Sequence, residues 1–464
     1  MKDRVKAALE NIEVKSGSKT FCVLPWIHMA TRPNGDLRVC CVANASGADT
    51  GDYSVGLVKT DIGYPANLAN TLPSEAFNSE YMRSIRQVML AGGMPSSCKK
   101  CYDEEAEGIA SKRLWETYTW ENEGTDITEL VKSTAEDGSV PFKLNYLDLR
   151  LGNTCNLKCI MCSPHDSSKW VKDHAIVFDK FESPLIKKQM KWDIKEFNNS
   201  WHENPALWEE IYQQIPNITH LYFAGGEPLM IKEHTMFLQK IIKTGYAKNI
   251  NLRYNSNGML VSQEFIDLWK NFKQVKYSVS LDGIGHRGEY IRYPLDWKRV
   301  EENLWMLENT PDNIQPRIAC AVQILNIKHI PDFIKWKVTS NFKKLNMEPT
   351  IDGHTLGGGL MSVHLVWIPT WFSLRVLPEK DKAEVRALFS DLKDWLYKNY
   401  TTDESFWNKN PYGWQRWESI LNWMDSDDQS YLLDDFKNYI TVMDNQRSTS
   451  FTDTFPELAH LLQK

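Results

Sequence analysis

Several features are missing from this 464-residue sequence, and each absence excludes a class of protein. No apolar run approaches the roughly 20 residues that a membrane-spanning helix needs. The first residues, MKDRVKAALENIEVKSG, contain no apolar signal segment. The 54 basic side chains are outnumbered by 60 acidic ones, so the formal charge of -6 supplies no broad cationic field for a nucleic acid. We therefore expect a soluble, cytoplasmic protein that binds neither membranes nor nucleic acid.

Cysteine is absent after residue 320, and this uneven distribution indicates metal binding. Eight of the nine cysteines lie within the first 162 residues, most of them in tight groups. In a reducing compartment such groups are more often metal ligands or free thiols than disulfides. Cys320 is the exception: it lies inside the alternating run RIACAVQI, and we expect it to be a small buried hydrophobic residue.

Residues 142–360 alternate between short apolar segments and longer amphipathic ones, a pattern typical of βα units around a parallel sheet. The predicted strands are 143–151, 218–226, 249–257, 275–283, 317–325 and 347–353. Helices are predicted between them over 233–245, 262–272 and 297–310. Six such units predict an α/β fold with a partial (β/α)6 TIM-like barrel.

The rest of the chain divides around this barrel. Residues 1–112 form a small cysteine-rich domain with turn-rich loops and one predicted helix over 74–92, ended by two glycines. Residues 113–141 are polar and acidic, and we interpret them as a linker. Residues 361–464 are predicted to be a mainly helical, aromatic-rich segment, which covers the barrel mouth, binds a leader peptide or packs on the barrel exterior.

Three cysteines follow the first predicted barrel strand directly. In the run RLGNTCNLKCIMCS, Cys155, Cys159 and Cys162 lie within eight residues. A four-iron cluster held by three thiolates has one iron without a protein ligand, and that iron needs a small chelating molecule. A zinc site completed by His165 is the alternative.

This CxxxCxxC spacing after a first barrel strand resembles the signature of the radical S-adenosylmethionine (radical SAM) superfamily. The resemblance implies that Cys155, Cys159 and Cys162 hold a [4Fe-4S] cluster whose open iron is chelated by SAM. It also implies reductive cleavage of SAM to a 5'-deoxyadenosyl radical, with the electron coming from a donor such as flavodoxin or ferredoxin.

Other segments resemble the superfamily's cofactor-binding motifs, and three of them (GGEP, NSNG and SLDG) directly follow predicted strands. Met161 stands where an aromatic residue commonly packs near adenine. The resemblance assigns SAM contacts to Met161, Gly225, Gly226, Glu227, Asn255, Asn257, Ser280, Asp282, Arg292, Val322 and Asn326.

The first cysteine group combines Cys22, a Gly-x4-Cys40 segment and the pair Cys98 and Cys101. This spacing is typical of either a four-cysteine zinc ribbon or a four-iron cluster. The run FCVLPW, the NG turn, the CC pair and the closing CKKCY resemble the SPASM/twitch domain of radical SAM enzymes, here placed before the barrel. The resemblance implies that Cys22, Cys40, Cys98 and Cys101 ligate a second, auxiliary [4Fe-4S] cluster, with Cys41 as the alternative to Cys40.

The expected function follows from the same resemblance: hydrogen-atom abstraction that oxidises, cross-links or otherwise modifies a peptide or protein. Dehydrogenation of a small molecule is the alternative substrate class. A non-catalytic zinc or iron-sulfur scaffold or electron carrier is the alternative of a different class, and methyl or methylthio transfer to RNA is disfavoured by the acidic charge balance. Asp352 and His354 follow the last predicted strand, where they either serve as acid/base residues or form an ordinary turn and surface.

Overall fold

The computed structural model describes residues 2–43, 56–106, 111–192, 200–346, 360–404, 406–407 and 413–463. Eight strands form one sheet in the order β2-β1-β3-β4-β5-β6-β7-β8. The strands are β1 (His28–Thr31), β2 (Leu37–Arg38), β3 (Tyr146–Arg150), β4 (His220–Ala224), β5 (Asn251–Ser256), β6 (Gln274–Ser280), β7 (Ile314–Val322) and β8 (Ser362–Leu365). Neighbouring strands are parallel except for β1 and β2. The predicted α/β class is therefore confirmed, and the sheet is consistent with a partial barrel.

Five of the six predicted barrel strands lie where the sequence placed them, as β3 to β7. The sixth predicted strand, 347–353, lies outside the described residues. In the structure the strand beside β7 is β8, which belongs to the segment predicted to be helical. Its short sequence, SVHL, carries too weak a pattern to distinguish it from a loop, so this strand was not predicted.

The N-terminal residues extend the barrel sheet rather than forming a separate layer. His28 of β1 pairs with Tyr146 of β3. The predicted linker 113–141 contains α7 (Lys112–Asn122) and α8 (Ile127–Lys132), and both helices contact α1 (Lys2–Ser16). Because Trp120 is buried, this segment is part of the packed N-terminal region.

The helix predicted over 74–92 is divided into α4 (Pro73–Phe77) and α5 (Glu80–Leu90). Ser79 interrupts it, because its side-chain oxygen accepts a hydrogen bond from the backbone N–H of Met82 and so caps α5. The other N-terminal helices are α2 (Leu24–Ile27) and α6 (Lys99–Ala106).

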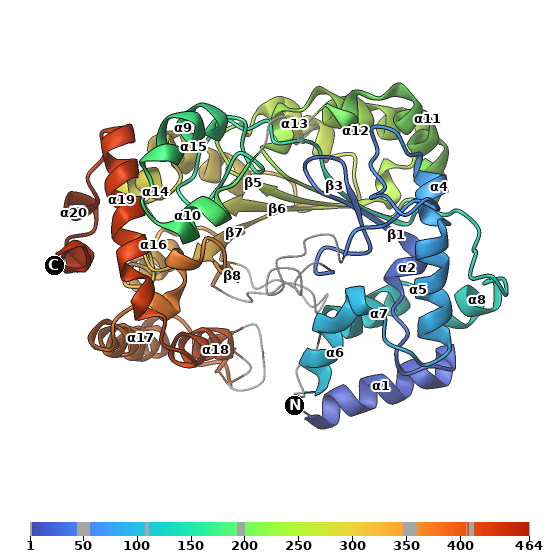
Figure 1. The fold of residues 1–464 in the computed structure, drawn as a ribbon, viewed down its shortest axis with the longest axis horizontal. Helices are drawn as coiled ribbons and strands as arrows, with labels where there is room; N and C mark the ends of the chain where they lie inside the picture. Colours follow the sequence, from blue (N-terminus) through green and yellow to red (C-terminus); the bar gives the residue numbers. More distant parts are fainter. Residues whose placement is uncertain are drawn as a thin grey trace.

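The helices that follow the strands cover one face of the sheet (Figure 1). They are α9 (Trp170–Val177), α10 (Pro184–Gln189), α11 (Pro205–Gln214), α12 (Lys232–Thr244), α13 (Gln263–Trp269), α14 (Gly285–Ile291), α15 (Trp297–Glu308) and α16 (Ile330–Thr339). Because helices cover only one face of the sheet, the residues of β6 alternate strictly between buried and half-buried. The buried face is apolar, with Val275, Tyr277 and Val279, whereas Lys276 and Ser278 lie on the other face.

Beyond β8 the described C-terminal residues include the helices α17 (Glu379–Asn399), α18 (Trp414–Asp425), α19 (Leu433–Arg447) and α20 (Phe451–Thr454). Figure 1 shows these helices and the N-terminal helices on opposite sides of the uncovered face of the sheet. No helix among the described residues is both long and apolar enough to cross a membrane.

Candidate functional site

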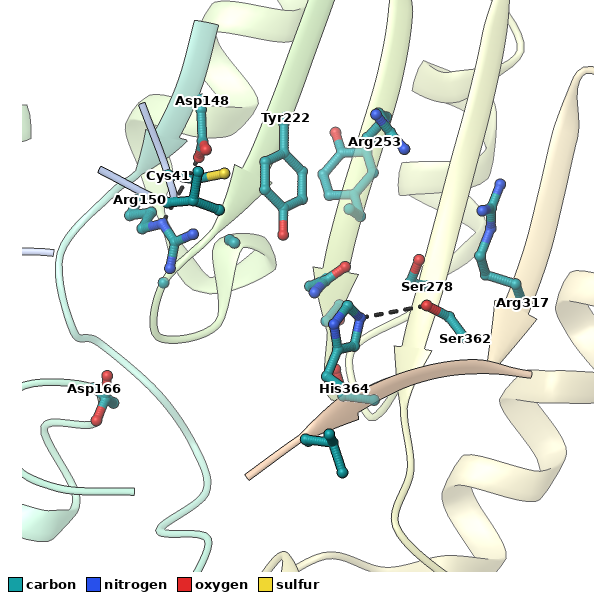
Figure 2. Close-up of a pocket in the computed structure, with 18 of the residues that line it drawn as sticks. Cys41, Asp148, Arg150, Asp166, Tyr222, Arg253, Ser278, Arg317, Ser362 and His364 are labelled. Atoms are coloured by element: carbon teal, nitrogen blue, oxygen red, sulfur yellow. Dashed lines mark hydrogen bonds and ion pairs between the residues drawn. The ribbon is translucent and has the colours of Figure 1, made fainter. Parts of the chain in front are cut away.

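The uncovered face of the sheet forms one wall of a cavity of about 980 Å³, part of which is drawn in Figure 2. The cysteine loop, β3 to β8, α6, α7 and α18 all contribute to the lining. The cavity brings together nine of the residues predicted to hold the first cluster or SAM, from five separate segments: Cys155, Cys159, Cys162, Gly225, Gly226, Asn255, Asn257, Ser280 and Arg292.

Hydrogen bonds to the backbone fix the cysteine loop. The amides of Lys158 and Ile160 donate to the carbonyls of Tyr293 and Ile291, each at 2.7 Å. The indole N–H of Trp170 donates to the carbonyl of Cys159 at 2.8 Å. The loop therefore has a defined position relative to the chain after α14, which contributes Arg292 to the same cavity.

The three thiols of this loop influence one another. Burial, together with the nearby Cys159, raises the pKa of Cys155 to about 12. A hydrogen bond between the thiols of Cys159 and Cys162 lowers the pKa of the first and, with burial, raises that of the second. Buried thiols with a raised pKa, such as Cys155 and Cys162, gain most when a metal supplies positive charge and binds them as thiolates.

Glycine at the end of β4 allows two loops to approach closely. The amide of Gly226 donates to the carbonyl of Gly152, and the next amide, of Glu227, donates to the carbonyl of Thr154 at 2.7 Å. A Cβ at Gly226 would lie 2.2 Å from that carbonyl oxygen. Gly225 has a φ of +114°, a region that favours glycine. These glycines line the cavity, and their close backbone contact is with the cysteine loop.

Glu227 links two strand-end loops from behind the cavity wall. Its carboxylate accepts hydrogen bonds from Ser256 Oγ and the Asn257 amide, both at 2.8 Å, and from the Leu229 amide at 3.2 Å. Burial nevertheless raises the pKa of Glu227 to about 7, since the three hydrogen bonds offset only part of the desolvation. Asn257 in turn donates to Asn156 Oδ1 of the cysteine loop at 2.7 Å.

Glu227 is one of five predicted cofactor contacts that do not line the cavity; the others are Met161, Asp282, Val322 and Asn326. Asp282 is fully buried and pairs with Arg292 at 2.8 Å. Asn326 donates to the carbonyl of Asp282 at 3.0 Å. Asp282, Cys159 and Cys162 all raise the pKa of Arg292. These contacts position Arg292 beside the thiols.

The first cysteine group gathers at a second, much smaller cavity of about 20 Å³, lined by Cys22, Cys40, Cys98 and Cys101. Burial is the largest cause that raises the pKa of each of these thiols, and the neighbouring thiols add to it for Cys22, Cys40 and Cys98. Cys41 lines the large cavity and not this small one.

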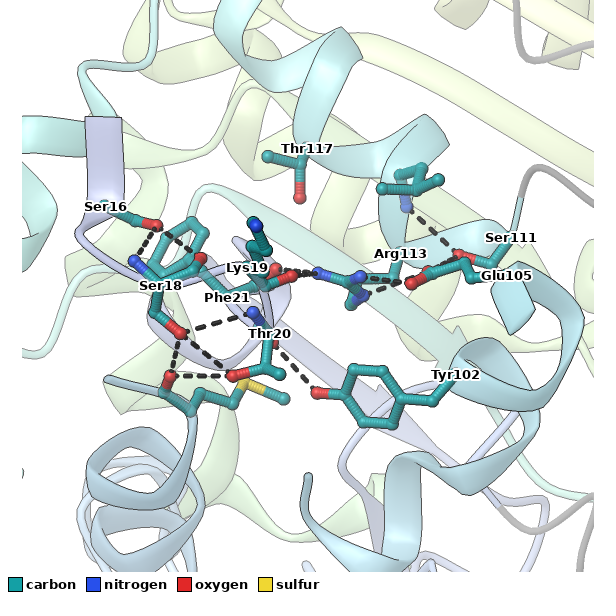
Figure 3. Close-up of polar contacts among 12 residues, drawn as sticks. Ser16, Ser18, Lys19, Thr20, Phe21, Tyr102, Glu105, Ser111, Arg113 and Thr117 are labelled. Carbon is teal, nitrogen blue, oxygen red and sulfur yellow. Dashed lines mark hydrogen bonds and ion pairs between the residues drawn. The ribbon is translucent and has the colours of Figure 1, made fainter. Parts of the chain in front are cut away.

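A buried polar network holds the segment before Cys22 against α6 and α7 (Figure 3). Arg113 donates to the carbonyls of Lys19 and Phe21 at 2.9 and 2.6 Å and pairs with Glu105. The hydroxyl of Tyr102 donates to the carbonyl of Thr20 at 2.9 Å. Since Cys101 is the neighbour of Tyr102 on α6, the network fixes the distance between the two halves of the cysteine group.

The donor sets fit iron-sulfur ligation. Each cysteine of a four-iron cluster binds a different iron, so the thiols surround the cluster rather than converge on one point. Within the described ranges, no three His, Cys, Asp or Glu side chains converge on a single-ion site. His165, the alternative zinc ligand, is exposed and does not line the cavity. Asp352 and His354 lie outside the described residues.

The sequence analysis missed the polar residues of the sheet itself. Arg253, Lys276 and Arg317 line the cavity from β5, β6 and β7, beside Tyr222 on β4 and Asp148 on β3. A signal for them was present: each is a polar residue at an alternate position of an otherwise apolar strand, which places it on the face opposite the helices.

Comparisons with known proteins agree with this geometry. Residues 149–329, which include the three-cysteine loop, match the model of the Radical SAM superfamily. Two similar curated proteins are GTP 3',8-cyclases from Campylobacter jejuni (strain RM1221), 28% identical over 145 residues, and from Clostridium botulinum (strain Hall), 22% identical over 147 residues. Each match covers 31% of this chain, and 37% and 36% of those proteins, so the chain spans little more than a third of their length.

Solved structures with some similarity include Streptococcus suis SuiB and native anSMEcpe with bound AdoMet. SuiB is 12% identical with a TM-score of 0.33, covering 73% of this chain and 67% of its own. The anSMEcpe structure is 17% identical with a TM-score of 0.35, covering 57% of this chain and 62% of its own. At these scores neither structure bears on what this chain acts on.

Proposed function

We propose that the chain is a radical SAM enzyme that cleaves SAM reductively and abstracts a hydrogen atom from a substrate held in the barrel cavity. Cys155, Cys159 and Cys162 would hold a [4Fe-4S] cluster with one iron open to SAM. When bound, the cluster passes an electron to SAM and thereby yields a 5'-deoxyadenosyl radical. Flavodoxin or ferredoxin is the proposed class of electron donor.

One observation carries the proposal: the cysteine loop and the ends of β4, β5 and β6 open onto the same cavity. Amide, hydroxyl and exposed backbone groups therefore stand beside the thiols, at Gly226, Asn257 and Ser280. We propose that these groups and Arg292 orient the polar parts of SAM. The surrounding wall excludes bulk water from the radical.

The second cysteine group supports oxidation as the outcome. Its small cavity and the large cavity share lining residues, namely Val42, Lys100 and Lys112. An auxiliary [4Fe-4S] cluster held by Cys22, Cys40, Cys98 and Cys101 would therefore border the substrate site. From there it would accept an electron from a substrate radical.

We propose a peptide or protein as the substrate, on the resemblance of the N-terminal cysteine pattern to auxiliary-cluster enzymes that modify such substrates. A small molecule is the second candidate, favoured by the cavity volume of about 980 Å³, which is at the upper end of the range for small-molecule sites. Hydrogen-atom abstraction is the first step toward either an oxidised or a cross-linked substrate.

Anaerobic reconstitution with iron and sulfide tests the proposal. We expect about eight irons per chain, and formation of 5'-deoxyadenosine and methionine when dithionite and SAM are added. Cys320→Ala is the matched control for iron binding, because this thiol lines neither cavity. Iron binding without SAM cleavage, or zinc binding alone, would instead identify a non-catalytic scaffold.

A further inference from the structure

Three cationic side chains lie on neighbouring strands and face the large cavity. Arg253 on β5 and Lys276 on β6 are direct cross-strand partners, and Arg317 on β7 is the partner of Ser278. All of them line the cavity. Figure 2 shows Arg253 and Arg317 with Ser278 between them. Because neighbouring strands are about 4.8 Å apart, the three cations share one region of the wall.

Two of these cations differ from most others around the cavity in having no carboxylate partner. Four other lining cations form ion pairs: Lys100 with Glu104 at 3.0 Å, Lys112 with Glu116 at 2.5 Å, Arg150 with Asp148 at 3.7 Å and Arg292 with Asp282 at 2.8 Å. Across the described part of the chain, Arg253 and Arg317 form no ion pair within 4.0 Å and no side-chain hydrogen bond. Their guanidinium donors are therefore available to a ligand.

Burial and the neighbouring cations disfavour the charged forms of Lys276 and Arg317. Burial, with Arg253 and Arg317 nearby, lowers the pKa of Lys276 to about 7, although Glu123 acts in the opposite direction. Burial and Arg253 lower the pKa of Arg317 to about 9. Like charges held together in a partly dehydrated wall are costly in the absence of an anion, and such arrangements are found at functional sites more often than elsewhere.

We propose that Arg253, Lys276 and Arg317 bind an anionic group of the substrate, either a carboxylate or a phosphate, inside the barrel. The inference rests on the proposed function, since it takes the cavity to hold the substrate. Guanidinium groups bind both kinds of anion through two parallel hydrogen bonds. Tyr222, the cross-strand partner of Arg253, and Ser278 also line the cavity and add neutral hydroxyl donors.

The position of this site along the strands restricts the substrate further. On β5, Asn255 lies two residues beyond Arg253 toward the strand end, and on β6, Ser280 lies four residues beyond Lys276. With a rise of about 3.3 Å per residue, the backbone of Arg253 and Lys276 lies about 7 to 13 Å from Asn255 and Ser280, which line the same cavity as the cysteine loop. We therefore expect the anionic group and the reacting carbon of the substrate to be several bonds apart.

Titration calorimetry on the anaerobically reconstituted, SAM-loaded protein tests this inference, with pyrophosphate and glutarate as probes. We expect at least one probe to bind. Arg253→Gln and Arg317→Gln should each weaken binding by about tenfold or more, as expected for loss of a charge-assisted contact. Arg317→Lys, which keeps the charge, should restore part of the affinity. The matched control is Arg386→Gln, on the exposed surface of α17, which should bind like the unmodified protein.

The outcomes distinguish a phosphate from a carboxylate, and they distinguish failure of the anion site from failure of the proposed SAM cleavage. Tighter binding of pyrophosphate indicates a phosphate-bearing substrate, and tighter binding of glutarate a carboxylate. If neither probe binds, or if both Arg→Gln variants with an unchanged circular dichroism spectrum bind as tightly as the control, the anion site is overturned. SAM cleavage by the unmodified protein is measured in the same preparation. Its absence would overturn the proposed function, whatever the probes do.

Discussion

The clearest test of the architecture concerns Arg447, at the end of α19. Its side chain is 2% exposed and donates to the carbonyl of Lys158, in the cysteine loop, at 2.7 Å. The guanidinium also lies 3.5 Å from Asp173 and packs over the rings of Trp170 and Tyr293, at 4.9 and 5.3 Å from their centroids. The C-terminal helix thus supports the loop that carries the three cysteines.

Arg447→Ala should lower the free energy of unfolding by about 5 kcal/mol. Removing one member of a buried ion pair costs roughly 3 to 5 kcal/mol, and stacking of a desolvated cation on aromatic rings adds about 2. Asp173 keeps a second partner, Lys158 at 2.7 Å, so the lower end of the first range applies. The Lys158 carbonyl, by contrast, loses the charged donor that α19 provides.

Urea denaturation of the iron-free protein measures this loss, and Arg386→Ala is the control. Arg386 is an arginine of the same C-terminal segment, but its side chain is 44% exposed, so its pair with Asp425 should contribute less than about 1 kcal/mol. We also expect Arg447→Ala to bind fewer irons on reconstitution. If the two variants lose equal stability and bind equal iron, α19 does not support the loop and the reasoning is refuted.

Three further predictions concern the site itself. Cys162→Ala should reduce bound iron by about four per chain, whereas Cys320→Ala should leave it unchanged, as iron analysis will show. Gly226→Ala should destabilise the fold by about 2 kcal/mol or more, because its Cβ would lie 2.2 Å from a carbonyl oxygen. The control is Gly245→Ala, where the Cβ would meet open space but φ is +81°, and it should cost about 1 kcal/mol. Thermal unfolding of the two variants measures the difference. The pKa of Glu227 is raised from 4.5 to about 7, so its contribution to stability is complete below pH 4.5 and is lost as the pH rises through 7. The stability of the unmodified protein relative to Glu227→Gln should therefore fall by about 3 kcal/mol from pH 4.5 to pH 8, and a difference that does not vary with pH would contradict the assignment.

The strand-end motifs could be predicted because their signals are local. An apolar run followed by a glycine or asparagine turn defines both a strand and its end, and in a parallel sheet such ends meet at one edge. Gly225, Asn255 and Ser280 were predicted to lie at such strand ends, as SAM contacts that the resemblance implied, and all three line the same cavity in the structure. Glu227 shows the limit of this logic. Its motif predicted a ligand contact, whereas its carboxylate satisfies three donors behind the wall, an arrangement that only the packing of two loops determines.

The parts that could not be predicted depend on contacts between distant segments. Strand β1 joins the barrel sheet by pairing with β3, more than a hundred residues away, and nothing in the sequence HMAT specifies that partner. Likewise, Tyr439 donates to the carbonyl of Ile160 at 2.9 Å and Arg447 to that of Lys158, so α19 contacts the backbone on both sides of Cys159. The helical pattern of α19 predicts a helix but not the surface it covers.

These long-range contacts enclose the uncovered face of the sheet. An open sheet of parallel strands leaves one face uncovered, and here that face carries Arg253, Lys276 and Arg317 instead of an apolar core. A polar face of this kind must stay hydrated or be enclosed. The N-terminal and C-terminal segments enclose it: Lys112 comes from one side and Trp423 from the other. Each segment also contacts a cysteine group: the N-terminal segment carries Cys101 on α6, and the C-terminal segment contacts the loop beside Cys159. The same two segments therefore close the cavity and position both sets of thiols. A change at either end of the chain should therefore affect metal binding as well as access to the cavity.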